Sequence, residues 1–244
     1  MQLTEEQRLE RKLISRFQKA IVHYHLIDDD DRILVALSGG KDSLFLLEML
    51  ARRMRVHRPA IHVEAIHIRM ENIAYESDAS YLEHFAMQWG IKLHLVTTRF
   101  DVREGNKKPP CFLCSWNRRK QIFNFAQEHG FNKIALGHHM DDILHTTLMN
   151  EFFQGSFSSM PIKLKMRKMP LTLIRPLALC QEEDIRTYAQ QHNYQKQKKL
   201  CPYETDTHRA DIRQIFQQIE HMNPEARYSL WQALEREGKL IEES

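Results

Sequence analysis

The 244-residue sequence has no hydrophobic run long enough to cross a membrane. Its longest apolar stretch, Leu44–Leu50, contains Glu48 and falls far short of the ~20 residues that a spanning helix requires. The N-terminus lacks a basic segment followed by an apolar one, so we expect no secretory signal. Four cysteines are too few for a disulfide scaffold, and 42% hydrophobic residues exclude disorder as the main state. These absences predict a globular protein of the cytoplasm without a membrane partner.

Net charge is small, at +3, but the charges are unevenly distributed. Residues 103–120 hold six cations against one acid, 163–175 hold five cations and no acid, and 195–200 add three lysines. This segregation favours a polyanionic partner, although solvated lysine-rich loops would explain the charge equally well. The candidate nucleic-acid contacts are Lys107, Lys108, Arg118, Arg119, Lys163, Lys165, Arg167, Lys168, Lys198 and Lys199.

Short apolar strands alternate with helical patterns through the first two thirds of the chain. This alternation predicts right-handed crossovers and an α/β fold, a parallel Rossmann-like sheet with helices on both faces. The expected strands are 32–37, 61–68, 91–96, 133–136 and 171–174, and the expected helices are 4–25, 41–53, 77–89, 112–129, 141–154 and 182–191, with two more at the C-terminus.

The domain division follows from this pattern. We expect an N-terminal helix in residues 1–30 to pack on a nucleotide-binding core in 31–180, and residues 181–244 to form a helical extension of the same domain. Residues 156–170 are basic and carry two prolines, which predicts an exposed hairpin or loop. The last helix is expected to begin at Asn223-Pro224, an N-cap followed by proline.

The strongest local signal is Ser38-Gly39-Gly40-Lys41-Asp42-Ser43, between a strand and a helix. Two glycines let successive N–H groups approach an anion, and the helix start adds its positive dipole. The spacing matches neither a Walker A loop nor a dinucleotide fingerprint. Asp42 is the candidate Mg²⁺ ligand. The candidate nucleotide-binding residues are Ala36, Ser38, Gly39, Gly40, Lys41, Asp42, Ser43, Ile68 and Gly137.

A second motif, Gly137-His138-His139-Met140-Asp141-Asp142, follows the strand at 133–136. In a parallel sheet it lies at the same edge as the phosphate loop, where open α/β sheets bind ligands. One aspartate is expected to cap the following helix. The other aspartate and one histidine then remain available for metal binding or proton transfer. Asp142 is the candidate catalytic carboxylate.

The cysteines form a third pattern. Cys111 and Cys114 stand at the expected start of a helix beside arginines, which favours thiolates, and Cys201 follows in a basic loop. The pair fits a redox dithiol, half of a zinc site or part of an iron–sulfur site. Three thiolates can hold three irons of a [4Fe–4S] cluster and leave the fourth iron open. Cys180 is expected to be a small buried hydrophobe.

Together these motifs resemble a known family. The phosphate loop resembles the Ser-Gly-Gly-x-Asp-Ser loop of the PP-loop ATP pyrophosphatases, and Gly137–Asp142 resembles the Gly-His-x-x-Asp-Asp segment of members that modify tRNA. With one Cys-x-x-Cys and a third cysteine, nearly the whole chain is similar to the TtcA family of tRNA 2-thiocytidine synthetases. The resemblance implies a PP-loop (adenine nucleotide alpha hydrolase) fold. It also implies an ATP-dependent sulfurtransferase that adenylates C2 of a cytidine in the anticodon loop and replaces its oxygen by sulfur.

The same resemblance implies the cofactors and partners. These are ATP, Mg²⁺ at Asp42, and a [4Fe–4S] cluster held by Cys111, Cys114 and Cys201, with Asp142 as a further catalytic residue. The implied partners are tRNA, a sulfur donor (a cysteine desulfurase or free sulfide) and a second copy of the chain. Three alternatives stay open: a persulfide on Cys114 or Cys201 in place of the cluster, a different thiolated base, and an ATP-binding redox sensor.

Overall fold

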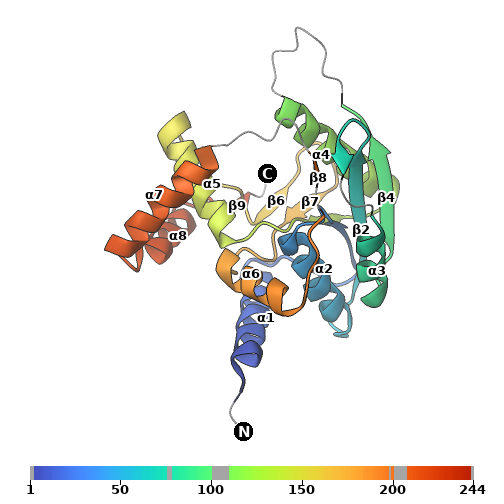
Figure 1. Ribbon diagram of the computed structural model, residues 1–244, viewed down its shortest axis with the longest axis horizontal. Coiled ribbons are helices and arrows are strands. Elements are labelled where there is room, and N and C mark those ends of the chain that lie inside the picture. The colour runs from blue at the N-terminus through green and yellow to red at the C-terminus, as the bar shows by residue number, and fades with distance from the viewer. Residues whose placement is uncertain (1–2, 76–78, 101–109, 198, 201–207, 243–244) are drawn as a thin grey trace.

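The computed structural model describes residues 3–75, 79–100, 110–197, 199–200 and 208–242. Helices and strands alternate along the chain as the sequence predicts (Figure 1). The helices are α1 (Glu5–His23), α2 (Lys41–Met54), α3 (Ser80–Gln88), α4 (Pro110–Glu128), α5 (Met140–Gln154), α6 (Glu182–Gln191), α7 (His208–Met222) and α8 (Ala226–Arg236). The strands are β1 (Asp31–Ala36), β2 (Ile61–Met70), β3 (Ala74–Tyr75), β4 (Leu93–Thr98), β5 (Lys133–Ala135), β6 (Lys163–Lys165), β7 (Thr172–Ile174), β8 (Lys199–Leu200) and β9 (Ile241–Glu242).

Within these residues a seven-stranded sheet has the order β4-β2-β1-β5-β7-β6-β9. The strands β4, β2, β1, β5 and β7 are mutually parallel, and β6 runs antiparallel to β7. The parallel core confirms the predicted α/β class. Strands β3 and β8 form a separate antiparallel pair. Among the described helices, none is both long and apolar enough to cross a bilayer.

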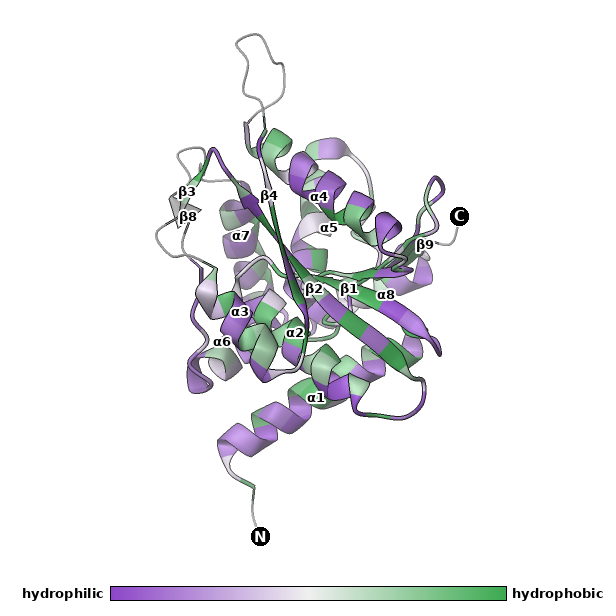
Figure 2. Ribbon diagram, turned by 90° about the vertical axis from the view of Figure 1, so that its right-hand side faces the viewer, coloured by the Kyte–Doolittle hydropathy of each residue, from purple (hydrophilic) through white to green (hydrophobic). Residues whose placement is uncertain are grey.

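Alternate residues of the strands feed two hydrophobic clusters, one on each face of the sheet. In β1, Ile33 and Val35 join the larger cluster, which includes side chains of α1, α2, α3 and α6. Leu34 joins the smaller cluster with Ala126 of α4. Figure 2 shows α4 on one side of the sheet and α1, α2 and α3 on the other. Burial of both faces explains the nearly continuous apolar sequence of β1.

Helix α1 begins where its capping residues predict. The Gln7 N–H donates to the Thr4 hydroxyl at 3.2 Å, and the Thr4 N–H donates to the Gln7 side-chain oxygen at 3.1 Å. This reciprocal capping box satisfies two N–H groups that the helix cannot satisfy itself. Lys12 and Arg16 then form ion pairs with Asp184, which ties α1 to α6.

The C-terminal region differs from the sequence prediction in two ways. Helix α8 begins at Ala226, not at Asn223-Pro224, because the Asn223 carbonyl and side chain accept the N–H groups of Ala226 and Glu225 and close a turn first. Strand β9 adds to the sheet beside β6, where further helix was expected. Helices α7 and α8 pack beside α5 (Figure 1). Residues 156–170 contain one strand, β6, of an antiparallel hairpin whose second strand, β7, follows them, and Ile162 is buried, so the predicted exposed hairpin or loop is correct only in part.

Candidate active site

The phosphate loop, Ser38–Ser43, connects β1 to α2. Gly39 has a φ of +85°, a conformation that glycine adopts without strain, and Gly40 is the N-cap of α2. The Gly40 carbonyl accepts the N–H groups of Ser43 and Leu44 at 3.1 Å each. The Ser38 hydroxyl donates to the Ser43 hydroxyl at 3.1 Å. The loop therefore has a defined backbone, with Ser38 exposed, Ser43 buried and a helix N-terminus beside them.

Two side chains of the loop carry its charge. The Lys41 ammonium lies 3.0 Å from Asp42 Oδ2 and 3.2 Å from Glu182 Oε1. Asp42 Oδ1 is buried and has no hydrogen-bond donor, and His139 Nε2 lies 3.8 Å from it. An uncompensated buried carboxylate oxygen is costly, and a hard divalent cation is a fitting partner for it. Asp42 thus fits the Mg²⁺ that the sequence predicts here.

The second motif lies against the phosphate loop. Strands β1 and β5 are parallel neighbours, so the residues that follow them meet at one edge, as predicted. A Cβ added to Gly137 would lie 3.1 Å from both the carbonyl carbon of Asp42 and the nitrogen of Ser43. Glycine is required at this position because two stretches of backbone approach each other closely.

The helix cap at α5 differs from the expectation. His139, not an aspartate, is the N-cap, and the Asp142 carboxylate accepts the His139 N–H at 3.1 Å. Asp141 instead accepts the Glu182 N–H at 2.7 Å and Arg227 Nη1 at 2.8 Å. Asp141 therefore joins three helices together, and Asp142 is the carboxylate that faces the site.

Burial lowers the pKa of three histidines near the site. Burial and the Arg175 guanidinium lower the pKa of His138 to about 4, and Arg175 Nε donates to His138 Nδ1 at 3.3 Å. Burial also lowers the pKa of His145. In β2, burial lowers the pKa of His67, whose Nδ1 donates to the Leu37 carbonyl at 2.7 Å while its buried Nε2 has no hydrogen-bond partner.

A cavity of about 530 Å³ lies where the two motifs meet. The motifs contribute Lys41, Asp42, His139 and Asp142, and α6 and α7 contribute residues that the sequence did not single out. Those additional residues were missed because charged side chains on helix surfaces ordinarily face solvent. They are Glu182, Arg209 and Arg213. A neighbouring cavity of about 320 Å³ extends from Gly40, Lys41 and Asp42 towards Tyr194 and Lys196.

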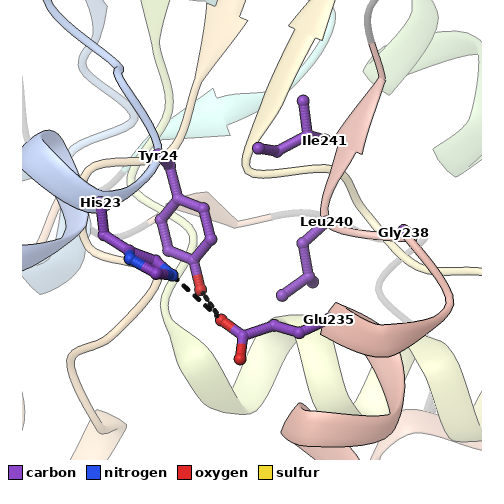
Figure 3. Close-up of a pocket in the computed structure, with 6 residues that line it drawn as sticks. All are labelled: His23, Tyr24, Glu235, Gly238, Leu240 and Ile241. Atoms are coloured by element: carbon purple, nitrogen blue, oxygen red, sulfur yellow. Dashed lines mark hydrogen bonds and ion pairs between the residues drawn. The ribbon is translucent and has the colours of Figure 1, made fainter.

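A further cavity, of about 360 Å³, lies between the end of α1 and the residues around β9 (Figure 3). Its polar groups bond to one another: the Tyr24 hydroxyl donates to Glu235 at 2.6 Å, and His23 lies 3.5 Å from the same carboxylate. Burial raises the pKa of Tyr24. No residue of either motif lines this cavity, so it is not the candidate active site.

Two predicted thiol ligands lie on the first turn of α4. Cys111 is exposed and Cys114 is half-buried. Their spacing of three residues places both sulfurs on one side of the helix. This donor set fits an iron–sulfur cluster, for which the third predicted ligand, Cys201, lies outside the described residues. Cys180 is buried, as predicted, and burial raises its pKa to about 12.

The remaining candidates are spread over several elements. Arg119 is exposed on α4, and its charge contributes to the lowered pKa of Arg175, which places α4 near the end of β7. Arg118 is half-buried on α4; Lys163 and Lys165 lie in β6; Arg167 and Lys168 are exposed in the hairpin; Ala36 ends β1 and Ile68 is buried in β2. For Lys199 the structure describes the backbone, in β8, and Lys107, Lys108 and Lys198 lie outside the described residues.

The fold and the paired motifs define a PP-loop protein, and residues 6–219 match the PP-loop domain family. The chain is 32% identical over 250 residues to a tRNA-cytidine(32) 2-sulfurtransferase from Geobacter metallireducens, covering 96% of this chain and 92% of that relative. It is 36% identical over 234 residues to a protein of the same name from Coxiella burnetii, covering 94% and 91%. The chain belongs to the TtcA family of tRNA-cytidine 2-sulfurtransferases, as the sequence motifs indicate.

A solved structure supports the fold. The U34-tRNA thiolase NcsA from Methanococcus maripaludis, determined with its [4Fe-4S] cluster, is 22% identical to this chain. The two structures superpose with a TM-score of 0.77 over 95% of this chain and 79% of NcsA.

Proposed function

We propose that this protein is an ATP-dependent tRNA thiolase that replaces the C2 oxygen of cytidine 32, in the anticodon loop, by sulfur. The observation that carries the proposal is the meeting of Asp42, His139 and Asp142 around one cavity, in a chain whose relatives bear the name tRNA-cytidine(32) 2-sulfurtransferase. Both motifs contribute to that cavity, as expected of a site that binds a nucleotide and its metal.

The nucleotide residues support the first step. The triphosphate would bind at the start of α2, at the N–H groups of Lys41 and Asp42, with the Lys41 ammonium as a counterion and Asp42 as the residue that would hold Mg²⁺. The cytidine C2 oxygen attacks the α-phosphorus, the bond to the bridging oxygen breaks, and pyrophosphate leaves. This step has a chemical purpose, because a carbonyl oxygen is a poor leaving group and AMP is a good one.

The cysteines support the second step. Cys111 and Cys114, together with Cys201, would hold the [4Fe–4S] cluster. When bound, the cluster supplies an iron with an open position that can carry the sulfur atom. The chain's own contribution in the described residues is to keep the sulfurs of Cys111 and Cys114 together at the start of α4. The exposure of Cys111 also suits a second candidate route, in which a cysteine persulfide delivers the sulfur and a partner thiol resolves the disulfide.

The basic residues would bind the RNA. A stacked base is inaccessible, and a loop nucleotide is the least costly to flip outward. The cations of α4 and of the β6–β7 hairpin would contact the phosphates around the flipped base. The proposal also includes a homodimer, cytoplasmic tRNA as substrate, and a cysteine desulfurase or free sulfide as the sulfur donor.

Anaerobic purification tests the proposal. Iron and acid-labile sulfide are measured per chain together with the visible absorption spectrum, and 2-thiocytidine in tRNA is measured by mass spectrometry after incubation with ATP. About four irons per chain and ATP- and tRNA-dependent release of pyrophosphate are expected. Thiolation by an iron-free protein would favour the persulfide route. Absence of tRNA-dependent pyrophosphate release would leave the ATP-binding redox sensor as the better explanation.

A further inference from the structure

Helix α7 presents an arginine-bearing face to the phosphate loop. Arg209, Arg213 and Gln217 recur every four residues and line the same cavity as Lys41 and Asp42. The adjoining face of α7 is fixed by packing: Ile212 and Phe216 are buried, and the Phe216 ring contacts His145 of α5 at a centroid distance of 5.7 Å. Because this apolar face is anchored, the two arginines are directed towards the site.

The two arginines act electrostatically on histidines of α5 and of the turn before it. The Arg209 charge contributes to the lowered pKa of His138, and the Arg213 charge contributes to that of His145. Arg213 also forms an ion pair with Glu182, whose other carboxylate oxygen lies 3.2 Å from the Lys41 ammonium. One carboxylate therefore connects α7 directly to the phosphate loop.

We propose that Arg209 and Arg213 bind the β- and γ-phosphates of ATP and stabilise the departing pyrophosphate; this assignment rests on the proposed function. In the reaction, the bond from the α-phosphorus to the cytidine oxygen forms, and the bond to the bridging oxygen breaks with its electron pair. Negative charge consequently increases on the pyrophosphate. Guanidinium groups match phosphate oxygens in a bidentate geometry, and fixed cations aimed at developing charge are effective in catalysis.

The position of Arg209 and Arg213 indicates that they bind the phosphates of ATP and not those of the RNA backbone. Their cavity contains both Asp42, the proposed Mg²⁺ ligand, and Lys41, the phosphate-loop cation. The acids Asp142 and Glu182 also line it. These carboxylates would repel an RNA strand, whereas a magnesium-bound triphosphate arrives with its own counterion.

Titration calorimetry with magnesium pyrophosphate tests the assignment on the full-length protein. The variants are Arg209→Ala, Arg213→Ala and Arg213→Lys, and the matched control is Arg236→Ala, an exposed arginine at the end of α8. Each alanine variant is expected to raise the Kd for pyrophosphate about tenfold. Arg213→Lys keeps the charge but loses the fork and should give a smaller increase. The Kd for tRNA and the control should stay within about twofold of wild type.

Two results would overturn the assignment. An unchanged Kd for pyrophosphate, with weaker tRNA binding, would assign the arginines to the RNA backbone. Equal Kd values for Arg213→Lys and Arg213→Ala, each with a lowered unfolding temperature, would reduce Arg213 to a structural partner of Glu182. If the wild-type protein binds neither ATP nor pyrophosphate, the proposed function itself fails, which separates that outcome from a failure of the arginine assignment.

Discussion

The two halves of the candidate site are built differently. The nucleotide half, Ser38–Ser43 with Gly137–Asp142, is packed closely: Ser43 and His139 are each 4% exposed, and Gly137 has no room for a side chain. The sulfur half, the first turn of α4 with Cys111 and Cys114, is exposed or half-buried. Phosphoryl chemistry depends on fixed positions of its charged groups, whereas a sulfur site must admit both an RNA base and a sulfur donor.

The largest expected effect comes from the cysteine variants, which should remove thiolation and leave ATP binding intact. Cys111→Ala or Cys114→Ala should abolish thiolation while the Kd for ATP stays within about twofold, because neither cysteine lines the nucleotide cavities. Mass spectrometry of tRNA and calorimetry with ATP measure the two quantities. Cys180→Ala, which alters a buried thiol that lines neither nucleotide cavity, should retain thiolation. Loss of ATP binding in the α4 variants would show that the halves are not independent.

Asp42→Asn should produce the next largest effect. Removal of the charge that would hold Mg²⁺ should weaken magnesium–ATP binding on the order of 100-fold, while binding of metal-free ATP should not weaken. Asp184→Asn is the matched control. Asp184 is also a partly buried, ion-paired aspartate, but it lies on α6 and pairs with Lys12 and Arg16 of α1. Equal losses with and without magnesium would contradict the metal role of Asp42.

Gly137→Ala tests the close packing of the nucleotide half. The added Cβ would press on the backbone of Asp42 and Ser43, which should lower the free energy of unfolding by about 1–3 kcal/mol and weaken ATP binding. Gly130→Ala provides the comparison, because Gly130 has a φ of +69° and no atom within 4 Å of an added Cβ. It should cost about 1 kcal/mol from backbone strain without affecting ATP. Chemical denaturation and calorimetry measure both variants.

The smallest expected effect concerns pH. The pKa of His138 is lowered to about 4, so below pH 6.5 the unfolded chain takes up a proton that the folded protein does not. Stability should therefore fall as pH decreases, by about 1 kcal/mol between pH 6.5 and 5.5 from this group. Denaturation at several pH values measures the slope, which should be shallower in His138→Gln. An identical slope in the variant would show that His138 is not the group responsible.

Local patterns were sufficient to predict most of the fold. The alternation of apolar strands with helical periods predicted the parallel core, and Thr4 with Gln7 predicted the start of α1. Strand β9 has two residues and pairs with the equally unremarkable β6, so it carries no periodic signal of its own. Its pairing depends on tertiary contacts that a local pattern does not contain.

In the candidate site, too, the residues that belong to local motifs were predicted, and those brought in by tertiary packing were not. The motifs Ser38–Ser43 and Gly137–Asp142 were recognisable in the sequence, because a phosphate site needs consecutive backbone N–H groups and therefore a characteristic glycine pattern. Arg209 and Arg213 are four residues apart on a helix and resemble an ordinary solvated face. They line the cavity because Ile212 and Phe216 pack that helix against α5, a tertiary contact that the local sequence does not reveal. The N-cap role of His139 was not predicted either, because histidine is not a preferred N-cap residue.

Glu182 supplies the candidate site with an anion of its own. Its carboxylate pairs with Lys41 and Arg213 together, so the proposed nucleotide would exchange one anion for another. A singly charged ion such as chloride offers no more charge than the carboxylate it would displace, whereas a triphosphate offers several charged oxygens at once. In the proposed site, the Glu182 ion pairs would therefore discriminate against singly charged anions and in favour of a polyphosphate.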